Sequence, residues 1–160
     1  MACELHPEEH AALKRALPRA GHVQIHHRDG WAAMNALLPP PQRRGLVLID
    51  PPYEANDELQ RTARALGPAL RRFGHGVYLW WRRLKSESAL AAADAEARAQ
   101  GARVTLRADL WIDAPQPEGR LNGSSLLFIN PPFGTKPALA EALPFLADAL
   151  TKGRSGWRLS

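Results

Sequence analysis

The sequence contains a single cysteine, Cys3, among its 160 residues. One cysteine can form neither an internal disulfide nor a cysteine-based metal site, which favours a reducing, cytoplasmic location. No apolar run reaches 18 residues, so a membrane-spanning helix is not expected. The first nine residues contain acids where a secretory signal needs basic and then apolar residues.

Charge of one sign is in excess, with a formal net charge of +5 and an isoelectric point near 10.0. A basic surface favours polyanionic partners such as nucleic acid. An arginine-rich proteome explains the same excess equally well, so charge alone does not choose between these interpretations. The length predicts one domain over residues 1–160 with a substantial core.

Strand-like and helix-like segments alternate along most of the chain, which predicts an α/β fold with a mainly parallel sheet. The last two strands follow each other directly, and this pair departs from the alternation. Pro68 predicts a kink or a break in its helix. The expected strands are 2–5, 23–27, 45–50, 76–81, 104–112 and 124–130, and the expected helices are 7–17, 31–38, 56–73, 86–100 and 135–153.

The stretch from Leu46 to Glu54 is the most informative part of the sequence. Four apolar residues predict a strand buried on both faces, and Pro51 and Pro52 then end its pairing. Asp50 is therefore expected at the carboxyl end of a central strand, where open α/β sheets bind their ligands. Tyr53 follows as an aromatic ring able to stack on a flat substrate.

This loop suits chemistry on the amino group of adenine, whose lone pair is delocalised into the ring. The Asp50 carboxylate and the Pro51 carbonyl can accept hydrogen bonds from that amine and localise the lone pair for attack. Tyr53 can stack on the base once the base has left its own stack. The alternative is a strand that simply ends in a Pro-Pro turn.

Two upstream positions are expected at the same edge of the sheet. Asp29 and Gly30 follow the preceding strand, where a carboxylate can accept from an exocyclic amine and glycine lets a ring approach the backbone. Glu4 ends the first strand, a position where an acid commonly binds ribose hydroxyls. Taken singly, residues of these types are more often caps or turn residues, and it is their shared position that favours a binding role.

A second Pro-Pro motif begins at Asn130 and ends at Phe133. No nucleotide-binding acid or glycine pair precedes it at a comparable spacing, so Asp50 is the stronger candidate. Trp81 is the tryptophan best placed to stack on a substrate.

Histidines and arginines give weaker signals. Strand alternation puts His26 and His27 on opposite faces, and no third ligand lies nearby, so no metal site is expected. Arginine clusters can contact phosphates only if they converge on one face. These clusters are Arg43-Arg44, Arg71-Arg72 and Arg82-Arg83-Lys85.

The segments Glu4 to Pro7, Asp29-Gly30 and Arg43 to Glu54 together resemble the RlmJ family, and the stretch from Phe128 to Phe133 also fits it. These are S-adenosylmethionine-dependent 23S rRNA adenine-N6 methyltransferases. The resemblance implies a Rossmann-like class I methyltransferase sheet, mostly parallel with an antiparallel last strand.

The resemblance also implies roles for individual residues. Asp50 and Pro51 would act at the target amine, while Tyr53 stacks on the base. Pro52 and Trp81 would lie on the substrate side of the site. The cofactor-binding residues implied in the same way are Glu4, Asp29 and Gly30.

The sequence departs from the family in lacking its first strand and the Gly-rich cofactor loop that follows it. It therefore looks like the C-terminal portion of a family member, whose sheet is completed by a missing N-terminal segment or by a second polypeptide. Two alternatives stay open. One is an inactive RNA-binding remnant, and the other is an amino-methyltransferase acting on DNA adenine or protein glutamine.

Overall fold

The computed structural model describes residues 1–17, 22–55, 57–113, 121–150 and 154–160. It divides into two compact units, Met1–Leu38 and Pro39–Ser160, and each is described here by itself. The single domain expected over residues 1–160 stays a prediction.

The first unit contains two short parallel strands and two helices. Strands β1 (Ala2–Glu4) and β2 (Ile25–His27) pair so that Glu4 lies opposite His27. Helix α1 (Pro7–Ala16) begins with the expected proline and two acids, which suit the positive end of a helix. Helix α2 (Gly30–Leu37) begins after Asp29, whose carboxylate accepts a hydrogen bond from the backbone N–H of Trp31 at 2.8 Å. The sequence predicted all of these elements.

The second unit is built on a five-stranded sheet in the order β3-β4-β6-β5-β7. Its strands are β3 (Leu46–Ile49), β4 (Val77–Leu84), β5 (Thr105–Trp111), β6 (Gly123–Ile129) and β7 (Gly156–Leu159). Its helices are α3 (Glu58–Arg72), α4 (Glu87–Ala99) and α5 (Thr135–Leu150). β7 has no counterpart among the strands that the sequence predicted.

The pairing of this sheet corrects the expectation of a mainly parallel arrangement. β3 and β4 are parallel, but β4–β6, β6–β5 and β5–β7 are antiparallel. β6 is the next described element after β5, and the two strands pair antiparallel. β6 then lies between β4 and β5, so β3, β4 and β5 share one direction while β6 runs the opposite way. The strand expected at 124–130 is present as β6 and is antiparallel to its neighbours, but the last strand of the chain is β7.

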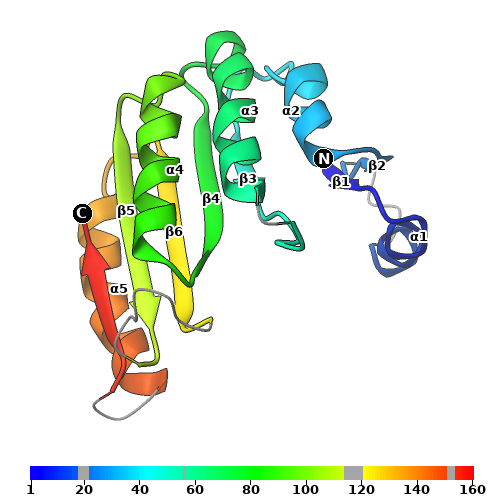
Figure 1. The fold of residues 1–160 in the computed structure, drawn as a ribbon. Helices are drawn as coiled ribbons and strands as arrows, with labels where there is room; N and C mark the ends of the chain where they lie inside the picture. The colour runs from blue at the N-terminus through cyan, green and yellow to red at the C-terminus, as the bar shows by residue number, and fades with distance from the viewer. Residues whose placement is uncertain (18–21, 56, 114–120, 151–153) are drawn as a thin grey trace. The chain divides into compact units, whose positions relative to one another are not determined.

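Helices lie on both sides of this sheet (Figure 1). α3 and α4 pack side by side on one face, whereas α5 lies along β5 and β7 on the other. Because β-strand side chains alternate, Ile49 is only 8% exposed while Leu46 and Leu48 are 62% and 64% exposed. On the sheet face that carries α5, the surface at β3 is therefore exposed and apolar.

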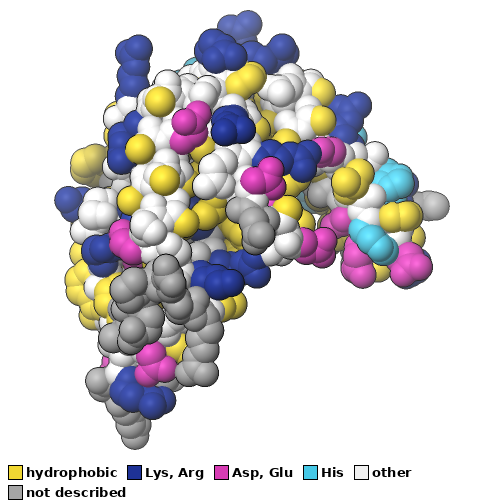
Figure 2. Space-filling view, in the orientation of Figure 1, with side chains coloured by type: hydrophobic (Ala, Val, Ile, Leu, Met, Phe, Trp, Pro, Cys, Tyr) yellow, Lys and Arg dark blue, Asp and Glu magenta, His cyan; other side chains and the backbone are white. Residues whose placement is uncertain are grey.

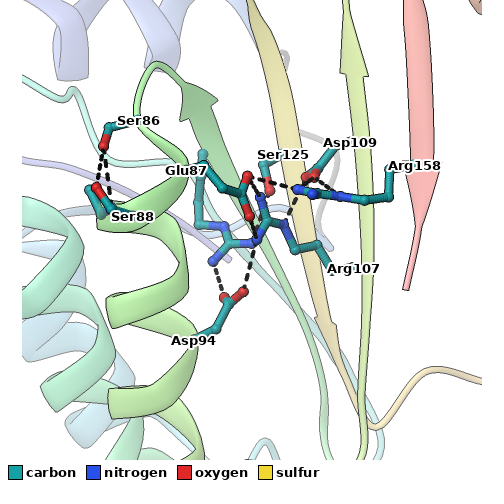
Figure 3. Close-up of polar contacts among 10 residues, drawn as sticks. Ser86, Glu87, Ser88, Asp94, Arg107, Asp109, Ser125 and Arg158 are labelled. Carbon is teal, nitrogen blue, oxygen red and sulfur yellow. Dashed lines mark hydrogen bonds and ion pairs between the residues drawn. The ribbon is translucent and has the colours of Figure 1, made fainter. Parts of the chain in front are cut away.

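A network of charged side chains lies between α4 and the sheet (Figure 3). Arg82, 0% exposed, donates to the carboxylate of Asp94 on α4 and to Ser125 Oγ at 2.9 Å. Arg107 donates to Asp109 at 2.9 Å, and Arg158 of β7 also donates to Asp109. Glu87 accepts from Arg107 and Arg158 at 2.8 and 2.7 Å. Three cations thus meet three carboxylates, and this pairing allows Arg82, Asp94, Arg107 and Asp109 to be buried while Glu87 and Arg158 stay exposed at the edge of the network.

Helix α3 continues through Pro68, so the predicted break does not occur. Ser86, where the expected helix 86–100 begins, caps α4, and its hydroxyl accepts from the Ala89 N–H at 3.3 Å. The connection between the expected strands 104–112 and 124–130 and the end of the last expected helix fall largely on residues 114–120 and 151–153, which lie outside the described residues. None of the helices described combines the length and apolar character needed to cross a bilayer.

Candidate active site

Asp50 lies directly after β3, at the strand end where the sequence placed it. The expectation of a central strand buried on both faces is wrong, because β3 ends the strand order and Leu46 and Leu48 are exposed on one of its faces. β3 ends at Ile49, and the exposed Asp50 is followed by a buried Pro51 and an exposed Pro52. Because β3 and β4 are parallel, this loop leaves the sheet at the same edge as the carboxyl end of β4. The Asp50 carboxylate is therefore open to a ligand at the edge where such sheets bind them.

Tyr53 is buried against β4 instead of presenting an open ring. It is 9% exposed, and its hydroxyl donates to the main-chain carbonyl of Trp81. Its ring meets the Trp81 ring edge to face, with 5.8 Å between the centroids. Burial raises the pKa of the Tyr53 hydroxyl above its ordinary value, and the nearby Asp50 and Glu58 carboxylates also raise it.

Arg83 covers the Tyr53 ring. Its guanidinium carbon lies 4.8 Å from the ring centroid, and its Nη2 donates to the Tyr53 carbonyl. The exposed stacking surface expected at Tyr53 is therefore not present in this conformation. A base can stack on this face only after the guanidinium has moved.

Trp81 and Arg83 lie on the same face of β4. Along this strand buried and half-buried residues alternate, with Trp81 and Arg83 half-buried and Arg82 buried between them. Arg82 therefore points toward α4 and is not available to phosphate. Of the cluster Arg82-Arg83-Lys85, only Arg83 and Lys85 lie on the accessible side.

Glu4 and Asp29 both lie at the carboxyl edge of the parallel pair in the first unit. This pair is a sheet of its own, so the edge shared with Asp50 stays a prediction. Glu4 Oε1 accepts from the His6 N–H at 2.7 Å, and Asp29 is the N-cap of α2. The turn and cap roles expected as alternatives are thus present. A Cβ added to Gly30 would have no heavy atom within 4 Å, so the space beside this glycine is open.

The second Pro-Pro motif lies at the opposite edge of the sheet from Asp50. β6 is antiparallel to β4, so its carboxyl end, Ile129, pairs near the start of β4 at Tyr78. The side-chain amide of Asn130 donates to the carbonyls of Gly74 and Gly76, each at 2.9 Å. These contacts make Asn130 a link between loops, and they support the preference for Asp50.

The remaining arginine pairs also lie away from Asp50. Arg43 and Arg44 precede β3, and Arg71 and Arg72 end α3 just before β4. They therefore lie at the amino-terminal ends of these strands. Figure 2 shows Lys and Arg side chains at several places on the side that bears α3 and α4, with apolar and acidic side chains between them.

Glu58 is a residue near the loop that the sequence did not single out. It begins α3, is 5% exposed, and its Oε2 atom has no hydrogen-bond partner among the described residues. An acid in a first helical turn is usually explained by the helix dipole, so no special signal in the sequence points to Glu58. The described residues contain no group of three or more His, Cys, Asp or Glu side chains suited to a metal.

The family model described as "Ribosomal RNA large subunit methyltransferase D, RlmJ" matches residues 1–160. The chain belongs to the RlmJ family. The resemblance recognised in the sequence is thereby confirmed.

Relatives and a solved structure agree with this membership. Over 155 residues the chain is 30% identical to the ribosomal RNA large subunit methyltransferase J of Haemophilus influenzae, covering 96% of this chain and 55% of that protein. The protein of the same name from Escherichia coli K12 is 28% identical over 153 residues, with the same coverage. The crystal structure of a Legionella pneumophila protein superposes with a TM-score of 0.87 at 32% identity, covering 99% of this chain and 58% of that one.

The chain thus spans about half the length of the curated relatives that it matches. The activity named for those relatives belongs to proteins that carry considerably more sequence. The chain is thus a member of the RlmJ family with a mixed α/β fold and a central sheet. The reaction that it takes part in is considered next as a proposal.

Proposed function

We propose that this chain takes part in S-adenosylmethionine-dependent methylation of adenine N6 in 23S ribosomal RNA. The observation that carries the proposal is the exposed Asp50 at the carboxyl end of β3, followed by Pro51, Pro52 and Tyr53, in a member of the RlmJ family. Its relatives are named as methyltransferases of large-subunit ribosomal RNA. An rRNA substrate would place the chain in the cytoplasm, as its single cysteine also favours.

The chemistry assigned to the loop is hydrogen bonding to the attacking amine. The Asp50 carboxylate accepts from one amine proton and the Pro51 carbonyl from the other, so that the lone pair is directed toward the methyl donor. Proline has no N–H to compete for the carbonyl, and its fixed φ holds the loop stiff. Fixed acceptors aimed at the developing positive charge lower the barrier by electrostatic preorganisation. This mechanism uses neither a covalent enzyme intermediate nor a metal.

The flipped adenine would lie on the substrate side, beside Pro52, Tyr53 and Trp81. Pro52 is exposed and Trp81 is half-buried, so both have surface to offer a base. The Tyr53 ring becomes a stacking surface when the guanidinium of Arg83 turns off the face of the ring while it keeps its hydrogen bond to the Tyr53 carbonyl. A base taken out of its stack is commonly held between aromatic and apolar side chains.

Glu4, Asp29 and Gly30 are the residues proposed to bind S-adenosylmethionine, which when bound supplies the methyl group. Two carboxylates at one sheet edge fit the ribose hydroxyls and exocyclic amine of an adenosine, and the open space beside Gly30 fits the approach of its ring. Glu4 accepts from the His6 N–H and Asp29 from the Trp31 N–H, and a carboxylate can accept several hydrogen bonds, so the chemistry of these groups is compatible with the ligand.

Within the mixed α/β fold, we propose that the five-stranded sheet is a Rossmann-like class I methyltransferase sheet that lacks its first strand. β3, β4 and β5 run in one direction with the antiparallel β6 between the last two, which supports it. β3 ends the strand order, and Leu46 and Leu48 are exposed on it. An apolar strand edge of this kind favours completion by a further segment or a second polypeptide.

Calorimetric titration with S-adenosylmethionine separates an enzyme from an RNA-binding remnant. Binding by the chain supports the enzyme, and its loss in Glu4→Gln or Asp29→Asn would locate the cofactor. RNA binding without any cofactor binding would favour the remnant.

Asp50→Ala tests the reaction itself, with methyl transfer from labelled S-adenosylmethionine to 23S rRNA as the measurement. Removal of one acceptor at the developing charge is expected to lower kcat by about 10²–10³-fold while cofactor affinity is unchanged. Glu54→Gln, which changes another exposed carboxylate of the same loop, is the matched control and should retain the rate. Wild-type rates in Asp50→Ala would contradict the assignment. Preferential methylation of DNA adenine or of a glutamine peptide would indicate the other amino-methyltransferases.

A further inference from the structure

Tyr53 has a backbone conformation that needs support from its surroundings. Its φ is +58°, in the left-handed region that residues other than glycine seldom adopt. Such a conformation persists only where neighbouring groups hold it in place. Tyr53 comes three residues after Asp50, so whatever holds Tyr53 also limits where the Asp50 carboxylate can lie.

The support comes from β4, the strand beside β3. The Tyr53 hydroxyl donates to the Trp81 carbonyl, and the Trp81 ring lies edge to face against it. Arg83 makes two contacts of different kinds: it donates to the Tyr53 carbonyl and lies over the ring at 4.8 Å. The side chain and the main chain of Tyr53 are thus both held, and Arg83 is the residue that touches both.

We propose that Arg83 is a positioning residue of the active site, which holds the loop from Asp50 to Tyr53 against β4 and so fixes the Asp50 carboxylate for the amine. The proposal rests on the function proposed above. Arg83 acts through Tyr53, and its own charge is not assigned to the reacting atoms. Among the described arginines of the cluster that begins at Arg82, it is this one that reaches the loop, because strand alternation turns Arg82 toward α4.

The shape of the guanidinium explains why arginine suits this position. Its planar group can stack on an aromatic ring while an N–H at its edge donates to a carbonyl. Lysine keeps the charge and can donate to the same carbonyl, but it lacks the planar face. Arg83→Lys is therefore expected to restore part of what Arg83→Ala loses.

The contact can be tested without any methyl transfer, because the chain has two tyrosines. Nitration by tetranitromethane, followed by peptide mass spectrometry, compares Tyr53 with Tyr78. Tyr78 is 0% exposed and donates to the carbonyls of Ala69 and Phe73, so it is an internal control. Loss of the cation–π contact and the hydrogen bond is expected to speed nitration of Tyr53 about tenfold in Arg83→Ala. Tyr78 should stay protected, and Arg64→Ala, an exposed arginine on α3, should change neither.

Methyl-transfer kinetics then test the consequence for the site. In Arg83→Ala kcat is expected to fall about tenfold, with KM for RNA changed by less than about threefold and cofactor affinity unchanged. Arg83→Lys should lie between wild type and Arg83→Ala in both nitration and kcat. A general loss of folding would instead expose Tyr78 together with Tyr53.

The two proposals fail in different ways. Unchanged nitration of Tyr53 in Arg83→Ala would overturn the positioning role whether or not the chain is active. A raised KM with an unchanged kcat would also overturn it, because Arg83 would then be a contact to RNA. Absence of methyl transfer by the wild-type chain, with Tyr53 opened as expected, would overturn the proposed function alone.

Discussion

The two faces of the five-stranded sheet differ in how far their charged side chains are buried and paired. Two adjacent residues of β4 show this difference. Arg82 points toward α4, where it is 0% exposed and paired with Asp94 and Ser125. Arg83 points to the other side, where it is half-buried over Tyr53. One face is sealed and its charges are matched. The other carries the loop with Asp50 and two exposed leucines.

One face of β4 therefore contributes mainly to the stability of the fold, and the other face contributes to the proposed active site. A network of buried ion pairs costs much to break but has little freedom to respond to a ligand. The open face can change its contacts when a ligand or another segment arrives. Substitutions on the α4 face should therefore change the free energy of unfolding, and those on the open face should change the site or its partners.

The largest expected effect on stability is that of Asp94→Ala. It leaves the buried guanidinium of Arg82 without its carboxylate, which is expected to lower the free energy of unfolding by about 3–5 kcal/mol. Urea denaturation followed by tryptophan fluorescence measures it. Glu141→Ala, at an exposed acid of α5, is the control and should change the value by less than about 0.5 kcal/mol. A small effect of Asp94→Ala would mean that Arg82 reaches water and that the face is not sealed.

A second comparison uses neighbouring residues of β3. Ile49 is 8% exposed on the α3–α4 side, and Ile49→Ala is expected to cost about 2–4 kcal/mol. Leu48 is 64% exposed on the other side, and Leu48→Ala is expected to cost less than about 1 kcal/mol. Thermal unfolding measures both. Equal costs would show that the open face is covered in solution, and Leu48 would then report on the segment that covers it.

The sequence predicted the local elements well, because apolar runs, caps and prolines act over a few residues. Asp50 lies at the strand end that Pro51 and Pro52 define, and Ser86 caps α4. The pairing of strands was predicted less well, since it depends on contacts distant in the sequence. β4 continues past the expected end at Trp81 to Leu84 because it pairs with β6 as far as Gly123.

Two features of the site and core also depended on such distant contacts. The burial of Tyr53 results from residues 28 and 30 positions away, on a strand whose register the sequence does not show. The ion-pair network joins Glu87 on α4 to Arg158 on β7, a separation of 71 residues. The adjacent arginines Arg82 and Arg83 cannot be told apart from the sequence alone. They differ in function because successive side chains of a strand point to opposite faces of the sheet.

The smallest effect is expected at the edge of the network, where Arg158 joins β7 to Asp109 and Glu87. Burial raises the pKa of Asp109, but hydrogen bonds from Arg107, Ser125 and Arg158 outweigh it and the pKa is lowered overall. The pKa of Glu87 is also lowered, because bonds from Arg107 and Arg158 outweigh the raising effect of its burial. A lowered folded-state pKa stabilises the fold above the unfolded-state value, about 4, and this stabilisation is lost as pH falls through the folded-state value.

Arg158→Ala is accordingly expected to cost about 1 kcal/mol at pH 7, because the Arg158 side chain is 44% exposed and Asp109 keeps its bond to Arg107. Urea denaturation from pH 7 to pH 3 measures the difference from wild type. It should shrink below about pH 4, as Asp109 and Glu87 become protonated and lose their attraction for Arg158. Arg154→Ala removes a 73% exposed arginine that lies 3.6 Å from Asp113, and it should have almost no effect at any pH. A difference that stayed constant down to pH 3 would show that Arg158 stabilises β7 by packing and not by its charge.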